Sequence, residues 1–493
     1  MAFTSLTFIA FITLAVLLSN ALPSPAGRSA VLLAANLAFI ASYLDNVAQV
    51  LPFAAFLVLC WLIVEGVRRS RSAAALGIGL AVVIAGFIVL KKFSFLDGLW
   101  NGALILPYTY LVIGLSYVLF RVLHLMIDAR QGELVRMVSP LHFFNYTCNF
   151  LSFVAGPIQR YPDYLSQQAS PLTLDRERVF GAFARVIKGF VKVAAVSAIF
   201  NYLFATVSGR LLVDGTVAAL PFATSALLFV AAAVCYTIYL YANFAGYMDI
   251  VIGVGTLMGQ QLPENFDKPF LARNFLDFWS RWHMTLSDWF KTYLFNPLLK
   301  AMAARVTAPQ LDPYLGVIAF FVTFLVMGVW HGTTAVFVVY GALMGAGASL
   351  NKLWQVTLTR RLGKKRYKAL GEKTVAIYLS RGLTFAYFAL ALTCLWVDMP
   401  QLLALTRRLG AVGIVGCYLA LALATGLAFF VWDLAVKLAM AGRTPRIAAA
   451  ATTAAPGGFV VVRRNLVLAL QILLAVTVAS FFHKAPEFVY RAF

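Results

Sequence analysis

Charged residues are scarce in this chain. Only 12% of the 493 residues are Asp, Glu, Lys or Arg, whereas 62% are hydrophobic. A soluble domain carries about 25% charged residues, so the composition excludes an ordinary soluble globule. Many windows reach the roughly 20 apolar residues that a membrane-spanning helix needs, and a helix satisfies its own backbone hydrogen bonds where lipid cannot. The composition predicts an all-α polytopic membrane protein.

Acidic residues are the scarcest of the charged ones. They number 19 against 40 Lys and Arg, which gives a formal net charge of +21. On a soluble protein such an excess would suggest nucleic acid. Here the basic residues cluster between hydrophobic runs, as they do in cytoplasmic loops. We therefore expect no nucleic-acid partner and expect contact with membrane lipid, whose inner leaflet is anionic.

Cysteine is rare, and several familiar site motifs are missing. The five cysteines are scattered and form no CxxC pair, which argues against a disulfide framework or a metal site. The chain also lacks an HExxH zinc motif, a phosphate-binding P-loop and a GxSxG nucleophile elbow. We expect no metal and no bound cofactor. The first apolar run lacks the positive n-region of a signal peptide, so we expect it to remain as the first helix.

What the chain has instead is a series of long apolar runs, which predict about 11–13 spanning helices plus re-entrant or interfacial ones. The runs cover 3–22, 30–45, 47–65, 73–91, 99–124, 186–208, 216–244, 314–331, 333–354, 382–398, 411–438 and 465–483. The densest basic cluster, at 360–381, places that segment in the cytoplasm. We expect one membrane domain over 1–493, with amino-terminal helices at 1–104, a core at 105–355 and carboxy-terminal helices at 356–493.

Polar residues interrupt this pattern in two places before the middle of the chain. Arg121, His124 and Asp128 lie at helical spacing and share one face. We expect them to pair internally, because polar groups near a membrane usually find partners; lining a cavity is the alternative. The segment 142–164 is short and is broken by Gly156-Pro157. It either lines an aqueous cavity or forms a plain loop.

Two histidines, each preceded by a tryptophan, mark the candidate reaction site. Trp282-His283 lies in a polar segment, 274–297, which we expect to be one interfacial or re-entrant helix near the cytoplasm. Trp330-His331 closes the apolar run 314–331, toward the outer half of the membrane or at the floor of a cavity. An ionisable side chain at membrane depth is a functional candidate, and histidine moves protons near neutral pH. Such a base could deprotonate a hydroxyl for attack on an activated acyl group. A packing role is the alternative for each histidine.

Longer motifs give these residues a family context. The stretch FAGYMDIVIGVGTLMGQQLPENFDKPFLARNFLDFWSRWHMTLSDWF at 244–290 resembles the signature region of the membrane-bound O-acyltransferase superfamily. It is most similar to the bacterial branch that holds the alginate O-acetyltransferase membrane subunit and the D-alanyl transferase of teichoic acids. Further matches are LSYVLFRVLHLMID at 115–128, GPIQRYPDY at 156–164, GVWHG at 328–332 and EFVYRAF at 487–493.

The resemblance implies a helical funnel with a central tunnel through the membrane. It implies that His331 is the catalytic histidine and His283 the second motif histidine, with the acyl donor on the cytoplasmic side and the acceptor outside. One departure concerns the substrate. After WHMTLS the alginate branch runs into a glycine-containing loop, whereas residues 293–305 here have no glycine pair. The stretch 264–275 resembles the D-alanyl branch, and the length of the chain resembles the acetylating one.

The resemblance implies an O-acyltransferase of the bacterial cytoplasmic membrane that O-acylates a cell-surface or exported polysaccharide, and we expect acetyl to be the transferred group. The donor is acetyl-CoA or the phosphopantetheine thioester of an acyl-carrier protein, and an extracytoplasmic esterase-like protein is the expected partner. The predicted donor-side and substrate residues are Asn274, Arg281, Trp282, Asp288, Lys291 and Trp330.

Three alternatives stay open. Arg281 and Lys291 either attract the phosphates of the donor or extend to the membrane surface without a binding role. The donor group is either acetyl or D-alanyl delivered by a carrier protein. A transporter or flippase without covalent chemistry would predict internal repeats with broken helices, and no repeat is visible in the sequence.

Overall fold

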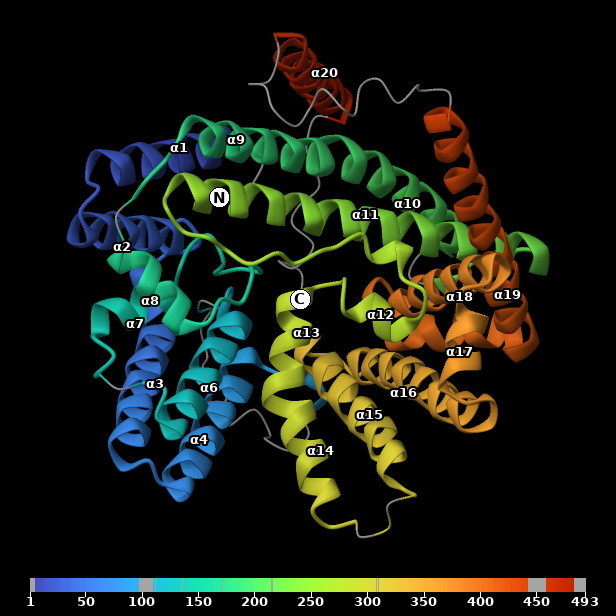
Figure 1. Ribbon diagram of the computed structural model, residues 1–493, viewed down its shortest axis with the longest axis horizontal. Helices are drawn as coiled ribbons and strands as arrows, with labels where there is room; N and C mark the ends of the chain where they lie inside the picture. Colours follow the sequence, from blue (N-terminus) through green and yellow to red (C-terminus); the bar gives the residue numbers. More distant parts are fainter. Residues whose placement is uncertain are drawn as a thin grey trace.

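The computed structural model of the chain describes residues 5–96, 110, 112–134, 136–170, 172–213, 216–306, 308, 310–441 and 458–482. Within these residues the regular structure is helical, apart from one hairpin that pairs β1 (Leu212–Val213) with β2 (Thr216–Val217). Figure 1 shows helices throughout the molecule. The prediction of an all-α polytopic membrane protein is confirmed.

Eight of the described helices are long and apolar enough to cross a membrane. Two further apolar helices, Leu6–Ala21 and Pro25–Ala41, are shorter, and the apolar stretch Leu466–Val478 is part of the longer helix Gly458–Phe482. At about 1.5 Å per residue, helices of 16 and 17 residues fall short of the roughly 30 Å hydrocarbon core. The expected runs 3–22 and 30–45 therefore form helices that are not full spans by length.

The amino-terminal helices form one side of the molecule (Figure 1). They are α1 (Leu6–Ala21), α2 (Pro25–Ala41), η1 (Val47–Val50), α3 (Leu51–Ser70), α4 (Ala73–Lys91), η2 (Ser94–Leu96), α6 (Leu115–Gln131), α7 (Pro140–Thr147) and α8 (Tyr161–Ala169). Between α3 and α4 the chain reverses at Arg71, which is left-handed, and Ser72, which caps α4. The first part of the predicted run 99–124 lies outside the described residues.

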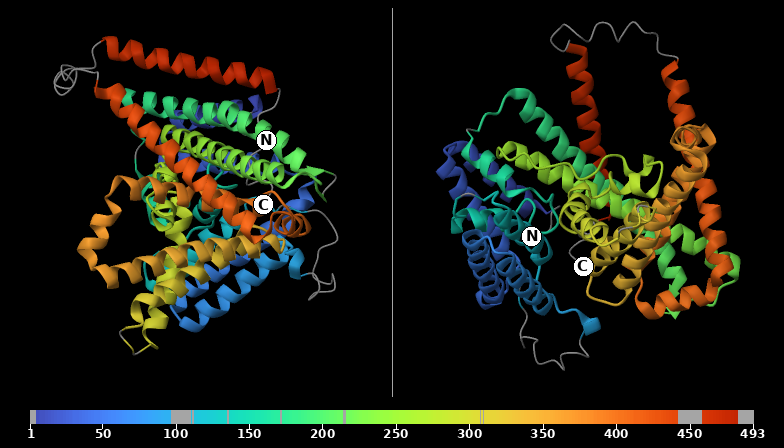
Figure 2. Two further views of the ribbon diagram at one scale, coloured as in Figure 1. Left: turned by 90° about the vertical axis from the view of Figure 1, so that its right-hand side faces the viewer. Right: turned by 60° about the horizontal axis from the view of Figure 1, so that its bottom comes forward.

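Two long helical segments cross the middle of the molecule side by side (Figures 1 and 2). The first consists of α9 (Arg176–Val191), the π-helix η3 (Lys192–Ser197) and α10 (Ala198–Leu211), and the second is α11 (Phe222–Leu257). In Figure 2, α20 (Gly458–Phe482) lies along the outside of this pair. The residues 442–457 and 483–493, which hold Arg443, Arg446, His483 and the EFVYRAF tail, lie outside the described part of the chain.

The motif region and the carboxy-terminal helices complete the fold. Their elements are η4 (Pro269–Leu271), α12 (Phe275–Trp279), α13 (Met284–Phe290), η5 (Lys291–Phe295), α14 (Asn296–Ala303), α15 (Asp312–His331), α16 (Val336–Leu362), α17 (Lys364–Gly371), α18 (Thr374–Ala391), η6 (Leu392–Leu395) and α19 (Met399–Ala441). The largest core cluster draws buried residues from Phe8 through to Cys394, so this region and the amino-terminal helices share one interior.

The prediction of a single helix over 274–297 is wrong. The segment forms α12 and α13, separated by residues 280–283, and then the π-helical turn η5. Asn274 begins α12 by accepting a hydrogen bond from the Asp277 N–H. His283 has φ 46°, in the left-handed region, and a left-handed residue cannot continue a right-handed helix. This break sets the direction of the His283 ring.

The prediction that the polar face of α6 pairs internally is confirmed. Arg121 donates to the carbonyl oxygens of Thr147 and Ser152, both at 2.6 Å. His124 is hydrogen-bonded to the Tyr146 hydroxyl. Asp128 accepts a hydrogen bond from Tyr293 at 3.0 Å and lies 3.6 Å from the guanidinium of Arg160.

The segment 142–164 is interrupted as predicted. Its helix α7 ends at Thr147, a turn region follows, and α8 begins only at Tyr161. Residues of the turn region accept the hydrogen bonds of Arg121, and Arg160 at its end approaches Asp128. The interruption therefore supplies partners for the polar face of α6.

Candidate active site

His331 is positioned by the tight packing of α15 against α16. The two helices touch at Gly328 and Gly341, where a Cβ on Gly328 would lie 2.2 Å from the Gly341 Cα. Glycine permits this close approach of two backbones in a membrane protein. His331 is the last residue of α15, one turn beyond the contact, and its side chain is buried. Its ring meets Tyr340 of α16 edge-on, with centroids 5.6 Å apart.

His283 is held from both ring nitrogens. Its Nδ1 lies 3.2 Å from the Asn265 Oδ1, and its Nε2 lies 3.2 Å from the Tyr117 hydroxyl. The same Asn265 oxygen accepts from the Thr285 N–H and hydroxyl, at 3.1 and 3.0 Å. A backbone N–H can only donate, so this atom is the amide oxygen and Nδ1 carries the proton. The lone pair of Nε2 therefore accepts the Tyr117 hydroxyl.

The electrostatics of His283 favour the uncharged ring. The residue is 1% exposed, and burial in a low-dielectric interior disfavours the charged form. This burial lowers the pKa of His283 well below the usual 6.5, and His331 nearby lowers it further. At neutral pH the His283 imidazole is therefore neutral, with its free lone pair on Nε2.

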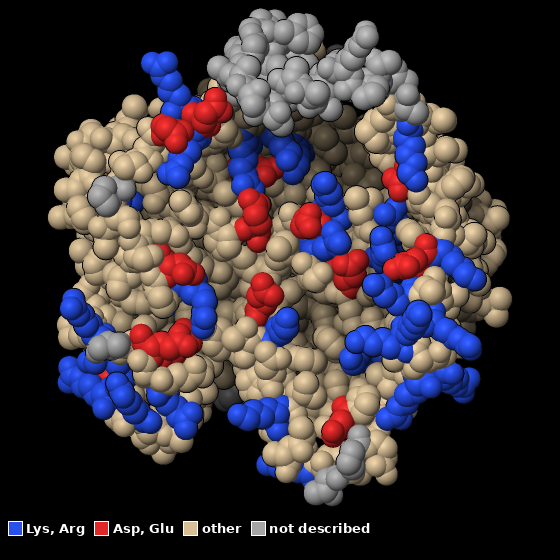
Figure 3. Space-filling model, in the orientation of Figure 1, with Lys and Arg blue, Asp and Glu red and all other residues tan. Residues whose placement is uncertain are grey.

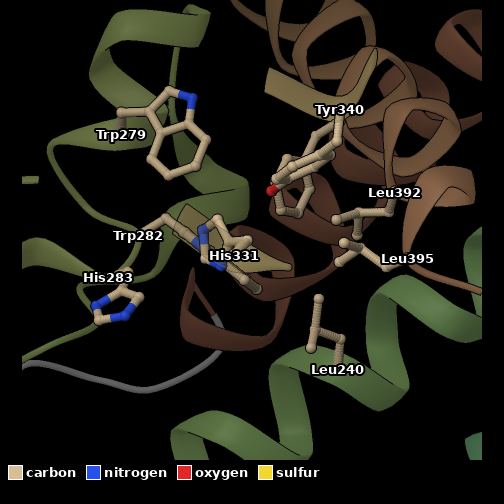
Figure 4. Close-up of a pocket in the computed structure, with 9 residues that line it drawn as sticks. Leu240, Trp279, Trp282, His283, His331, Tyr340, Leu392 and Leu395 are labelled. Carbon is tan, nitrogen blue, oxygen red and sulfur yellow. The ribbon is translucent and has the colours of Figure 1, made fainter. Parts of the chain in front are cut away.

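The two motif histidines line one pocket (Figure 4). The other residues of its wall are aromatic or aliphatic: Leu240, Trp279, Trp282, Tyr340, Phe388, Leu392 and Leu395. They come from α11, α12, the connection 280–283 between α12 and α13, α16, α18 and η6. The cavity volume open to the centres of water molecules is only ≈ 10 Å³, which corresponds to about one water molecule. The wall is thus narrow and combines aromatic and aliphatic side chains with the polar atoms of two imidazoles.

Trp330 lies beside this pocket and connects α15 to α6. Its ring contacts Tyr117 edge-on, with centroids 5.7 Å apart, and lies 4.8 Å from the His331 ring. Its indole N–H donates to the Ser116 carbonyl at 3.4 Å. Tyr117 therefore contacts both His283 and the tryptophan that precedes His331.

The other predicted donor-side residues lie away from the pocket wall. Asn274 caps α12. Arg281 forms ion pairs with Asp277 at 2.8 Å and Asp267 at 3.4 Å, so its charge already has acidic partners. Asp288 and Lys291 are exposed. Of the predicted site residues, the structure brings His331, His283 and Trp282 together around the pocket, with Trp330 adjacent.

Charged side chains gather on the face of the molecule that carries α12 and α13. Figure 3 shows both signs in the middle of this face and a concentration of Lys and Arg toward the side of α16 and α17. The basic residues on those two helices are Lys352, Arg360, Arg361, Lys364, Lys365, Arg366 and Lys368. An anionic donor would meet a positive potential on this face.

Two residues of the site, Tyr117 and Asn265, were missed by the sequence reasoning. Tyr117 precedes Arg121 by four positions and so lies on the same face of α6 as Arg121, His124 and Asp128. That spacing would have found it. Asn265 stands in the quoted stretch ENFDKP, but its contact with His283, 18 residues later, depends on a turn of the chain that the pattern does not reveal.

Metal ligands and disulfides play no visible part in the described portion of the chain. No group of three or more His, Cys, Asp or Glu side chains there could hold a metal ion. All five cysteines are described; they are unpaired, and four of them are buried.

Comparison with known proteins gives a consistent result. The profile of the family described as MBOAT, membrane-bound O-acyltransferase family, matches residues 103–389. A teichoic acid D-alanyltransferase of Streptococcus thermophilus is 29% identical over 300 residues, 58% of this chain and 69% of that protein. A probable alginate O-acetylase of Pseudomonas fluorescens is 28% identical over 277 residues, 55% of this chain and 50% of that protein.

A third relative is similar over a shorter region. The peptidoglycan O-acetyltransferase of Helicobacter pylori is 38% identical over 119 residues, 24% of this chain and 21% of that protein. The match thus spans about half of the Pseudomonas relative and a fifth of the Helicobacter one.

Proposed function

The chain belongs to the membrane-bound O-acyltransferase family, and from this premise we propose that it transfers acetyl groups to a cell-surface or exported polysaccharide. It is a multi-pass membrane acyltransferase. The observation that carries the proposal is that His283 and His331, from separate parts of the chain, line one narrow pocket. Membership in an acyltransferase family argues against a transporter or flippase without covalent chemistry.

In the proposed reaction His331 is the general base. Its imidazole takes the proton of an acceptor hydroxyl, the hydroxyl oxygen attacks the acyl carbonyl of the thioester, and the thiolate of the donor leaves. An apolar wall excludes water, which would otherwise hydrolyse the activated acyl group. His283 and Trp282 form the donor side of the same pocket, and Trp330 lies beside it. General base catalysis of this kind contributes about 10²–10⁴-fold in rate.

The donor is proposed to approach from the charged face that Figure 3 shows. Lys and Arg concentrate in cytoplasmic segments of membrane proteins, and the basic residues of α16 and α17 follow this rule. Arg281 and Lys291 lie on the polar motif segment next to the pocket and are proposed to attract the phosphates of CoA or of a phosphopantetheine arm. The acceptor and an extracytoplasmic esterase-like partner would then meet the enzyme on the opposite side of the bacterial inner membrane.

The pocket favours acetyl over D-alanyl. A D-alanyl group carries an ammonium near neutral pH, and burying an ammonium requires an acceptor or a counter-charge. No acidic side chain is present among the described residues of the wall. A methyl group has no such requirement. D-alanyl transfer remains the second candidate, because Trp279 and Trp282 offer aromatic faces that can hold a cation.

The proposal is tested by offering donors to the purified protein in liposomes. Radiolabelled acetyl-CoA, acetyl-carrier protein and D-alanyl-carrier protein are supplied separately, with an oligosaccharide acceptor and the candidate partner protein. We expect label to leave an acetyl donor and to appear as an alkali-labile ester. Turnover of the D-alanyl donor alone would show that the transferred group is D-alanyl and not acetyl. Turnover of none of the three donors would contradict the proposed function.

A further inference from the structure

Tyr117 contacts both His283 and Trp330, the neighbour of His331. It lies on α6, is 2% exposed, and donates its hydroxyl to Nε2 of His283. On its other side its ring meets Trp330, the neighbour of His331. The proposed reaction uses neither the hydroxyl nor this hydrogen bond.

The ring of His283 is fixed at an unusual cost to the backbone. A left-handed φ is uncommon for a residue other than glycine, and such strain persists only where the surroundings enforce it. Here Met284 N–H donates to the Asn265 carbonyl at 3.0 Å, and residues 266 and 282 form a β-bridge. The backbone thus aims the ring at two fixed partners, one on each nitrogen.

We propose that Tyr117 is a positioning residue whose hydroxyl, together with the Asn265 amide, holds His283 as an uncharged Nδ1–H imidazole beside His331. The inference rests on the proposed function and deepens it. A proton on His283 would place a positive charge next to the base and would oppose proton uptake by His331. With both nitrogens of His283 occupied, the incoming proton of the acceptor goes to His331.

The groups that face His283 support this assignment. Among the described residues, two titratable side chains face it: Tyr117 from α6 and His331 from α15. The helix α11 presents Phe244, whose ring lies 4.9 Å away and edge-on, and the preceding loop presents the uncharged Asn265. Neither Phe244 nor Asn265 supplies a negative charge to stabilise an imidazolium, and the Tyr117 O–H stabilises the neutral ring.

The test is the pH profile of Tyr117→Phe. This change removes one hydroxyl and keeps the ring against Trp330. The lost hydroxyl donates a hydrogen bond that stabilises the neutral His283 ring. Its removal raises the pKa of His283, so the ring becomes positively charged at a higher pH than in the wild type. A hydrogen bond of ordinary strength corresponds to about one pH unit. We expect the acid limb of acyl transfer to move up by about that amount, while the rate on the alkaline plateau and the KM of the donor change little.

Tyr247→Phe is the matched control. Tyr247 is equally buried and donates its hydroxyl to the Leu151 carbonyl at 3.2 Å, away from the pocket wall. Its profile should overlay that of the wild type. A Tyr117→Phe enzyme that loses activity equally at every pH, or not at all, overturns the proposal, as does the same shift in Tyr247→Phe. Should Tyr117→Phe not fold, Asn265→Asp serves instead, because a carboxylate at Nδ1 should raise the pKa of His283 and move the limb in the same direction.

A second measurement separates this proposal from the proposed function. Nitrogen-15 NMR of histidine-labelled protein reports which ring nitrogen of His283 is protonated, and the signal is assigned by its loss in His283→Gln. We expect an unprotonated Nε2 at neutral pH in the wild type and titration at higher pH in Tyr117→Phe. A protonated Nε2 overturns the proposal even in an active enzyme. If the wild type is inactive and His283 is the expected Nδ1–H tautomer, the acetyl-transfer proposal is contradicted and the assignment of Tyr117 is supported.

Discussion

The contact between Gly328 and Gly341 offers a direct way to move His331 without changing it. A methyl group added at Gly328 would lie 2.2 Å from the Gly341 Cα, 2.4 Å from its nitrogen and 2.8 Å from the Phe337 carbonyl oxygen. These are backbone atoms, so no side chain can rotate away. Carbon atoms in contact lie about 3.5–4.0 Å apart. In Gly328→Ala the helices α15 and α16 must therefore separate by about 1 Å or more at this point.

The size of the effect follows from the position of His331 one turn further on. Overpacking of this kind costs about 1–3 kcal/mol of stability. A catalytic group misplaced by about 1 Å costs about 10²-fold in rate. We therefore expect Gly328→Ala to lower the midpoint of thermal unfolding in detergent and to reduce acyl transfer about 10²-fold, with most of the loss in kcat.

Gly416→Ala is the control for the chemical change itself. Gly416 lies in the apolar helix α19, and a Cβ there would meet no heavy atom within 4 Å. Alanine is the better helix former by about 1 kcal/mol, so this variant should be as stable as the wild type or more so, with full activity. Normal stability and normal kcat in Gly328→Ala would refute the argument that this contact sets the position of His331.

Two further predictions concern the pocket and the polar face of α6. Leu395→Ala should widen the pocket and raise the rate with propionyl-CoA relative to acetyl-CoA about tenfold, since a methylene in an apolar pocket is worth about 1–3 kcal/mol. The measurement is the rate along a series of acyl-CoA donors. An unchanged preference would mean that this wall does not determine the length of the acyl chain. Burial raises the pKa of Asp128 to about 6, against the opposing effects of the Tyr293 hydrogen bond and Arg160. The folded state therefore binds this proton more tightly than the unfolded state, and stability falls as pH rises from about 4 to about 6. Asp128→Asn has no carboxyl group to lose this proton. The difference between its unfolding midpoint and that of the wild type should therefore be more favourable to the variant at about pH 8 than at about pH 5. Equal differences at both pH values would contradict the assignment.

Much of the fold could be predicted because the length and apolarity of a membrane helix are visible in the sequence. The runs 73–91, 314–331 and 333–354 predicted α4, α15 and α16 from these two properties alone. The break at 280–283 could not be predicted in this way. No glycine or proline stands between Asn274 and Asn296, and the left-handed His283 is enforced by Asn265 and by the bridge between residues 266 and 282, which are tertiary contacts.

The candidate site shows the same division. His283 and His331 stand out in the sequence because ionisable groups are rare in an apolar chain, and the structure places both on one pocket wall. Asn274 was predicted to lie on the donor side, and the sequence reasoning did not foresee that its side chain caps α12. The sequence reasoning also did not foresee the ion pair between Arg281 and Asp277, which lies four residues earlier on the same helical face.

The central claim is that the imidazole of residue 331 performs the transfer. The direct measurement compares single-turnover acyl transfer by His331→Gln and His142→Gln, each reconstituted in liposomes and shown to be folded by its unfolding midpoint. His142, on α7, does not belong to the described pocket wall, and its variant should retain the wild-type rate. We predict a loss of at least about 10²-fold in His331→Gln. A folded His331→Gln enzyme that transfers acyl groups at the wild-type rate would contradict the account.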